Sequence, residues 1–99
     1  MTAYAIIRVT IRVPGAMDQY RDRMPPLIEK YRGRLLANDR HPAAIEGASQ
    51  TGSIVLIEFP DVATAKAFYA DPDYLAAKKT REGKADLEVT IIEALASSH

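Results

Sequence analysis

The chain of 99 residues contains no cysteine and no tryptophan, and it has no excess of charge of either sign. Without cysteine it can form no disulfide, no thiolate nucleophile and no cysteine-ligated metal site. Thirteen basic residues balance thirteen acidic ones, so the chain lacks the strong field that draws proteins to nucleic acids or anionic lipids. We therefore expect no nucleic-acid or membrane partner, and no electrostatic barrier to self-association.

Long hydrophobic runs are also absent. No apolar stretch approaches the roughly 20 residues that a membrane-spanning helix needs, and a strand pattern begins directly after residues 1–3 without a basic or apolar leader. These features predict a cytoplasmic protein. Hydrophobic residues make up 47% and charged residues 26% of the sequence, which is typical of one globular domain over residues 1–99.

The first segment, residues 4–13, alternates between two kinds of side chain and is rich in β-branched residues, which predicts a strand. One face carries Ala5, Ile7, Val9, Ile11 and Val13, and we expect it to face the helices. The other face carries Tyr4, Ile6, Arg8, Thr10 and Arg12. Three more strands are predicted at residues 34–38, 54–59 and 87–93, and residues 39–52 form the longest irregular stretch.

Apolar residues recur every three or four positions from Met17 to Tyr31, which predicts an amphipathic helix. Pro25 and Pro26 interrupt its hydrogen bonding, so we expect a kink or a restart there. Asp61 and Asp71 are good N-caps for two further helical pieces, at residues 62–70 and from Pro72 to about residue 82.

The resulting order is β-α-β-β-α-β, which predicts an α+β fold of the ferredoxin-like type. Right-handed crossovers place both helical segments on one face of a four-stranded antiparallel sheet in the order 4-1-3-2. On the open face, Tyr4, Ile6, Ile54 and Leu56 would leave an apolar patch that small monomers avoid. We therefore expect a homodimer through this face, with Arg8 or Arg12 paired to Glu58 or Glu88.

A set of aromatic, glycine and charged positions along nearly the whole chain resembles the uncharacterised bacterial family DUF1330. These positions are Tyr4, Tyr20, Tyr31-Arg32-Gly33-Arg34, Glu46-Gly47, Glu58-Phe59-Pro60, Ala65, Phe68-Tyr69, Tyr74 and Arg81. The resemblance implies a dimeric α/β barrel, in which two ferredoxin-like sheets pack face to face. It implies no established chemistry. The family usually has two glycines after the tyrosine of the first helix, and here Arg32 replaces the first of them.

Histidines are few, and they do not form a metal-ligand pair. His41 lies in the long loop and His99 is the last residue, so no metal site or cofactor is expected. His41 is a weak candidate for a general base, because an imidazole titrates near neutral pH. Ser49, Thr51 and Ser53 lie near His41 in sequence, but without a recognised catalytic arrangement, and they are better explained as turn residues.

Five residues form the candidate ligand-binding set: Tyr31, Tyr69, Tyr74, Lys78 and Arg81. Tyr74, Lys78 and Arg81 are spaced to share one face of the last helical segment. A tyrosine beside two cations could bind a small carboxylate-bearing or phenolic compound. Alternatively, the aromatic rings simply seal the core, while the long cations extend along it into solvent.

Two functions remain open at this point. The first is a small-molecule binder or an enzyme that works without a cofactor, as other dimeric α/β barrels do, which is an argument from fold alone. The second is a non-enzymatic interaction or regulatory domain. A formed pocket with converging polar groups would favour the first function. A cleft filled by Tyr31, Phe68 and Tyr69 would favour the second.

Overall fold

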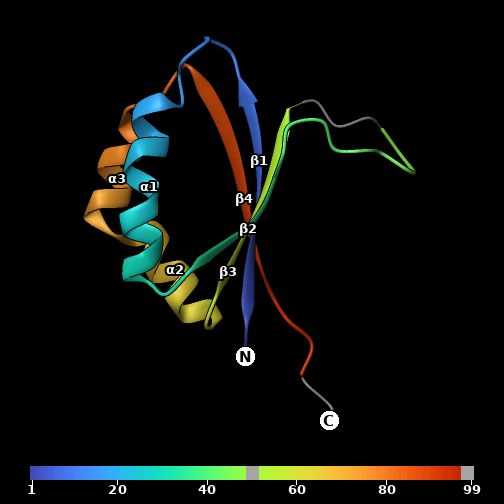
Figure 1. Cartoon of the computed structure of the whole chain (residues 1–99), viewed down its shortest axis with the longest axis vertical. Coiled ribbons are helices and arrows are strands. Elements are labelled where there is room, and N and C mark those ends of the chain that lie inside the picture. Colours follow the sequence, from blue (N-terminus) through green and yellow to red (C-terminus); the bar gives the residue numbers. More distant parts are fainter. Residues whose placement is uncertain (49–51, 97–99) are drawn as a thin grey trace.

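A four-stranded antiparallel sheet carries all the helices on one face in the computed structural model, which describes residues 1–48 and 52–96 (Figure 1). The elements in chain order are β1 (Ala3–Ile11), α1 (Asp18–Lys30), β2 (Arg34–Asp39), β3 (Ser53–Phe59), α2 (Val62–Ala70), α3 (Pro72–Lys79) and β4 (Ala85–Glu93). The strand order β2-β3-β1-β4 confirms the predicted ferredoxin-like βαββαβ fold. Ser49, Thr51 and His99 lie outside the described residues.

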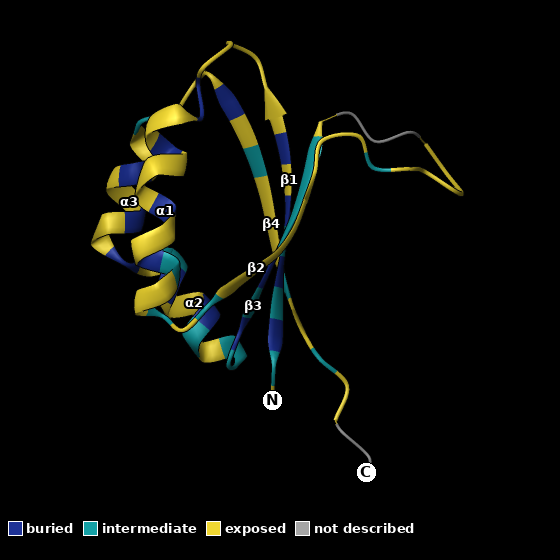
Figure 2. Ribbon diagram, viewed as in Figure 1, coloured by how far each residue is buried: buried dark blue, intermediate teal, exposed yellow. Residues whose placement is uncertain are grey.

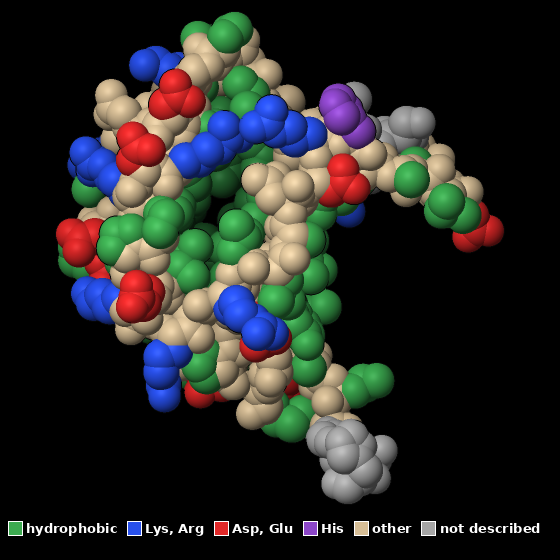
Figure 3. All heavy atoms as spheres, viewed as in Figure 1, with side chains coloured by type: hydrophobic (Ala, Val, Ile, Leu, Met, Phe, Trp, Pro, Cys, Tyr) green, Lys and Arg blue, Asp and Glu red, His purple; other side chains and the backbone are tan. Residues whose placement is uncertain are grey.

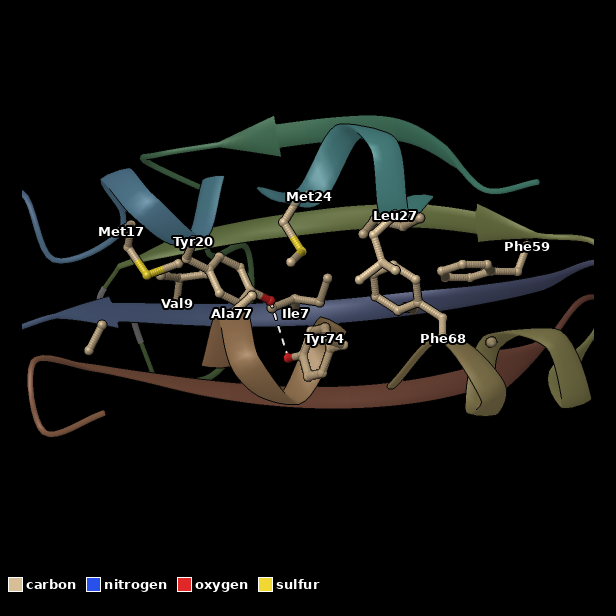
Figure 4. Close-up of a cluster of buried hydrophobic side chains, with 14 of the residues drawn as sticks. Ile7, Val9, Met17, Tyr20, Met24, Leu27, Phe59, Phe68, Tyr74 and Ala77 are labelled. Carbon is tan, nitrogen blue, oxygen red and sulfur yellow. Dashed lines mark hydrogen bonds between the residues drawn. The ribbon is translucent and has the colours of Figure 1, made fainter. Parts of the chain in front are cut away.

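The central strand β1 organises the sheet, because it pairs with β3 on one side and β4 on the other. Ala5 lies opposite Ile57 and Ile91. The odd-numbered residues of all three strands therefore face the helices. Ala5, Ile7 and Val9 are buried there, as predicted (Figure 2). The core they share with the helices also contains Met17, Tyr20, Met24, Leu27, Phe59, Phe68, Tyr74 and Ala77 (Figure 4).

Ile11 keeps the orientation of Ala5, Ile7 and Val9 in the register, opposite the buried Ala85, but neither Ile11 nor Val13 belongs to the buried core. Their side chains are 43% and 45% exposed, and β1 ends at Ile11. The chain turns back at Gly15, whose φ of +78° suits a residue without a side chain. Ala16 and Met17 then enter the core in place of the last two predicted positions.

The predicted interruption of the first helix at Pro25 and Pro26 does not divide α1, which is one helix over Asp18–Lys30. The two prolines cannot donate to the carbonyls of Arg21 and Asp22, four residues earlier. All four residues are exposed, so water can reach the carbonyls that lack an amide donor. Exposure therefore makes the proline pair tolerable within the helix.

The end of α1 has the hydrogen bonds of a Schellman motif. The Gly33 N–H donates to the Ile28 carbonyl (2.8 Å) and the Arg32 N–H donates to the Glu29 carbonyl (2.9 Å). Arg32 takes the left-handed conformation that this motif requires, with a φ of +55°. That conformation strains any residue with a Cβ atom, which is the physical reason why glycine is common there.

Replacing Arg32 with glycine should therefore stabilise the protein. The left-handed strain costs about 1–2 kcal/mol, of which the greater freedom of glycine in the unfolded chain cancels part, so we expect a gain of about 1 kcal/mol. The free energy of unfolding is measured by urea denaturation. Arg32→Ala is the matched control, because it removes the same charge and keeps the strain. An equal gain in stability in both variants would show that the loss of the charge, and not the relief of strain, stabilises the protein.

Asp71 joins the helices at the break between α2 and α3. Its Oδ1 accepts the Asp73 N–H (2.7 Å) and so caps α3. Its Oδ2 accepts the Lys30 ammonium (2.9 Å) and the Tyr31 hydroxyl (2.5 Å), both at the end of α1. The bonds from Tyr31, Lys30 and the Asp73 backbone lower the pKa of Asp71 to about 2. The carboxylate is therefore ionised whenever the protein is folded under ordinary conditions.

The free energy of unfolding should decrease as the pH is lowered and this carboxylate becomes protonated. The lowered pKa contributes stability that is complete above the unfolded value of 3.8 and is lost as the pH falls toward about 2. Asp71→Asn should therefore have a lower urea midpoint than wild type at pH 7, and the difference should shrink between pH 4 and pH 2. Asp73→Asn, which removes a neighbouring acid, is the control. A difference that did not depend on pH would contradict this role of the charge.

The helix α3 ends earlier than predicted, at Lys79 instead of about residue 82. A turn follows, in which the Arg81 N–H donates to the Lys78 carbonyl (3.2 Å), and Gly83 takes a φ of +76°. Arg81 consequently leaves the helix surface, and its side chain is buried at 6% exposure. This burial is central to the candidate site.

The open face of the sheet carries Tyr4, Ile6, Ile54 and Leu56, all half-buried in the single chain. Within the single chain, Arg12 contacts Asp86, and Arg34 contacts Glu58 at 3.6 Å; the charge pairing predicted for the dimer interface stays a prediction. Arg8 lies opposite Glu88 in the register. Residues 40–48, which follow β2, extend away from the sheet on the side opposite the helices (Figure 1). None of the helices in residues 1–48 and 52–96 is long and apolar enough to cross a membrane.

Candidate functional site

The space between α1 and the sheet contains a cavity of about 280 Å³, which we call the inner cavity. Figure 3 shows the molecule hollowed there, with hydrophobic side chains around the opening. The lining is mostly apolar, and its residues are Ile7, Val9, Met17, Tyr20, Arg21, Met24, Pro25, Ile28, Leu35, Asn38, Ser53, Val55, Ile57, Phe68, Tyr69 and Leu87. The apolar side chains of α1 therefore do not fill the space between the helix and the sheet completely.

Polar side chains of the inner cavity gather toward one end of it. Asn38 lies next to the last residue of β2, and Ser53 is the first residue of β3. Both share the helix-facing side of the sheet with Val55, as the register of the two strands shows. Arg21 belongs to the first half of α1. The cavity thus combines an apolar body with hydrogen-bonding groups from three elements.

A second, more open hollow of about 460 Å³ lies between α2, α3 and β4, and we call it the outer groove. Its residues are Lys66, Tyr69, Ala70, Tyr74, Leu75, Lys78, Arg81, Leu87, Val89 and Ile91. Three of them are cations and none is acidic. Leu87, Val89 and Ile91 alternate along β4 and give the groove an apolar floor.

A buried polar cluster of Tyr20, Tyr74 and Arg81 lies between the two hollows. The Tyr20 hydroxyl donates to the Tyr74 hydroxyl (3.2 Å), as Figure 4 shows. Arg81 Nη2 donates to the same Tyr74 oxygen (3.2 Å), and its guanidinium lies 4.9 Å from the centre of the Tyr20 ring. Burial, followed by the nearby Tyr74, raises the pKa of Tyr20 well above its usual range, so Tyr20 stays protonated.

Aromatic rings pack around Phe68, which is fully buried. Tyr31 and Tyr69 both meet it edge to face, with ring centres 6.0 and 4.8 Å away. Tyr69 also meets Tyr74 edge to face at 4.8 Å. Burial, together with the nearby Tyr74, raises the pKa of Tyr69. Tyr69 and Leu87 line both hollows and form the wall between them.

The fold brings four of the five predicted ligand-binding residues to the outer groove: Tyr69, Tyr74, Lys78 and Arg81. Tyr31 is placed elsewhere, because its hydroxyl is bonded to Asp71. His41 lies two residues beyond β2 and is exposed, with its backbone N–H donating to Asp39 (2.9 Å). It lines neither the inner cavity nor the outer groove.

Apart from Tyr69, the residues that line the inner cavity were not predicted from the sequence as ligand-binding residues. Tyr20 and Met24 belong to the apolar stripe predicted for the first helix, but a stripe does not reveal an unfilled space beside it. Asn38 and Ser53 carry no motif, and only the pairing of β2 with β3 brings them together. Within residues 1–48 and 52–96, no group of three or more histidine, aspartate or glutamate side chains is placed to hold a metal ion.

Solved structures of the same fold show how the chain compares with known proteins. A protein of unknown function from Rhodopseudomonas palustris matches with a TM-score of 0.77 at 19% identity, over 97% of this chain and 84% of its own. A dimeric ferredoxin-like protein of unknown function from Jannaschia sp. CCS1 matches with a TM-score of 0.66 at 18% identity, over 95% and 100%.

A third match is SnoaB from Streptomyces nogalater, described as a cofactor-independent oxygenase. Its TM-score is 0.63 at 14% identity, over 97% of this chain and 95% of its own. At these identities the matches show the fold alone. No curated protein gives a significant match.

The sequence itself identifies the family. The family described as "Domain of unknown function (DUF1330)" matches residues 2–95. This span includes every strand and helix of the fold. The protein therefore belongs to the DUF1330 family.

Proposed function

We propose that the protein binds a small phenolic compound in the inner cavity, or converts one there without a cofactor. The observation that carries the proposal is a formed cavity of about 280 Å³ with an apolar body and a few polar side chains at one end. Small-molecule sites have this composition, because apolar walls supply affinity and a few polar groups fix the orientation.

The size of the cavity limits the ligand. An engineered apolar cavity of roughly 150 Å³ binds benzene, so a cavity of about 280 Å³ has room for a compound of about two rings. Water is a poor occupant of the apolar part, because each ordered water needs two to four polar partners. An aromatic body is the better match to Phe68 and Tyr69, and Met17 and Met24 can adapt their shape to it.

The polar end supplies the recognition of a hydroxyl group. Arg21 can donate to a phenolic oxygen, Ser53 can donate or accept, and Asn38 offers both a donor and an acceptor. Arg21 is exposed, so it can close over a ligand without first breaking a buried contact. A phenolic oxygen facing these side chains would leave the ring among the apolar residues.

The comparison with SnoaB supports the possibility of chemistry without a cofactor. That protein is described as a cofactor-independent oxygenase, so the fold is compatible with such an activity. The alternative is a non-enzymatic interaction or regulatory domain. A cleft filled by Tyr31, Phe68 and Tyr69 would favour this alternative. These rings do pack together, but the inner cavity remains beside them, which favours a ligand.

Binding of 2-naphthol and naphthalene tests the proposal. Wild type should bind both, as measured by chemical-shift changes of residues around the inner cavity. Arg21→Met should weaken the binding of 2-naphthol about tenfold or more, which is the contribution of one hydrogen bond to a charged group. The binding of naphthalene should not change. Arg23→Met, on the same helix but outside the lining, is the matched control.

A variant that fills the cavity gives an independent test. Val55→Phe places a larger side chain in the inner cavity from β3, so it should abolish binding of both compounds while the protein stays folded. Binding of 2-naphthol by folded Val55→Phe at wild-type strength would place the compound elsewhere and refute the proposal.

We further propose that the protein is a homodimer through the open face of the sheet. Ile6, Ile54 and Leu56 form an apolar centre there, and Arg34 pairs with Glu58 beside it. Two structural neighbours, from Bacteroides fragilis and Jannaschia sp. CCS1, are described as dimeric. Apolar sheet faces of this kind are stable in solution when a second sheet covers them.

Light scattering at tens of micromolar should give twice the chain mass of 10.9 kDa for wild type. Ile6→Asp should give a monomer, because an unpaired carboxylate in an apolar interface is too costly to bury. Leu75→Asp is the control, since Leu75 is an exposed apolar residue on α3, on the helical side of the sheet. A dimer that survives Ile6→Asp unchanged would exclude this face.

A further inference from the structure

Arg81 is a buried cation, and no carboxylate within residues 1–48 and 52–96 forms an ion pair with it. Its exposure is 6%, and the ion pairs among the described residues involve Arg12, Lys30 and Arg34 instead. Its Nε is buried and has no hydrogen-bond partner. Buried charges in proteins are normally paired, so an unpaired guanidinium beside a hollow indicates a missing negative group.

The contacts that Arg81 does make compensate its charge only in part. The Tyr20 ring offers a cation–π contact at 4.9 Å, and the Tyr74 hydroxyl accepts one N–H at 3.2 Å. The Tyr20 ring supplies no negative charge, because burial raises the pKa of its hydroxyl and keeps it protonated. Since the Tyr74 oxygen accepts bonds from both Tyr20 and Arg81, its own hydrogen is left to donate to a further acceptor.

We propose that the outer groove binds a small monocarboxylate with an apolar body, whose carboxylate pairs with Arg81 and accepts a hydrogen bond from Tyr74. The planar fork of a guanidinium matches a carboxylate better than it matches a spherical anion. Lys66 and Lys78 add positive charge at the exposed rim of the groove. The site is separate from the inner cavity and does not depend on the function proposed for it.

The floor of the groove determines the rest of the ligand. Leu87, Val89 and Ile91 are apolar side chains of β4, and Leu75 faces them from α3. Val89 and Leu75 are 37% and 47% exposed, so they gain from being covered. A phosphate group alone would leave this strip uncovered, whereas an aryl or short alkyl carboxylate covers it while its charge reaches Arg81.

Benzoate and benzamide test the proposal, because they have the same shape and differ in charge. Titration followed by amide chemical shifts should show saturable binding of benzoate in the outer groove, with benzamide at least tenfold weaker. Raising the salt concentration should weaken benzoate binding, since the attraction at the exposed rim is screened. Equal binding of the two compounds would reduce the site to an apolar groove and overturn the proposal.

Substitutions assign the binding to the proposed side chains. Arg81→Met should weaken the binding of benzoate at least tenfold, and Lys78→Gln should weaken this binding two- to threefold. Lys79→Gln is the matched control, because Lys79 is the adjacent exposed lysine and does not line the groove. An equal effect of the two lysine variants, or wild-type affinity in folded Arg81→Met, would overturn the proposal.

A further variant decides the matter if Arg81→Met fails to fold. Tyr74→Phe keeps the aromatic ring that packs against Phe68 and Tyr69 and removes only the hydroxyl. It should weaken benzoate by several fold without changing the weak binding of benzamide. Unchanged benzoate affinity in Tyr74→Phe would remove the hydroxyl from the site and refute the proposed geometry.

Discussion

The helical layer depends on one carboxylate, that of Asp71. Its two oxygens accept bonds from the Asp73 backbone, the Lys30 ammonium and the Tyr31 hydroxyl, and so they connect the start of α3 with the end of α1. Bonds to an ionised acceptor are stronger than those between neutral groups. The three bonds also satisfy a group that is almost fully buried. Because this junction fixes the far end of α1, it also fixes the position of α1 over the sheet.

The packing of the aromatic rings follows from that junction. Tyr31, held by Asp71, rests its ring against Phe68, and Phe68 contacts Tyr69 and Tyr74 in turn. These rings fill the layer near the α2–α3 break. Toward the first half of α1, the side chains between helix and sheet include the flexible Met17 and Met24 beside Tyr20, and all three line the inner cavity. Dense packing at one end of the layer and space at the other thus coexist in a core of ordinary composition.

The two hollows differ in chemistry because different elements border them. The inner cavity lies against α1 and takes its polar groups from the ends of β2 and β3 and from Arg21 on α1. The outer groove lies against α3 and the edge strand β4, and its charge comes from lysines on the helices and from Arg81 in the turn that follows α3. A neutral aromatic compound suits the first and an anion suits the second, with Tyr69 between them.

The sequence by itself determined the order of the elements, the strand order and the core face of β1, because alternation, capping aspartates and glycine stops are local signals. It also grouped Tyr69, Tyr74, Lys78 and Arg81, which the structure brings to one groove. Only the tertiary structure decided that Arg81 is buried, since α3 ends at Lys79 and the following turn directs its side chain under Tyr20. The tertiary structure alone also decided that Asn38 and Ser53 line one cavity. Such features depend on how side chains from distant segments fill a shared space, and a local pattern carries no information about that volume.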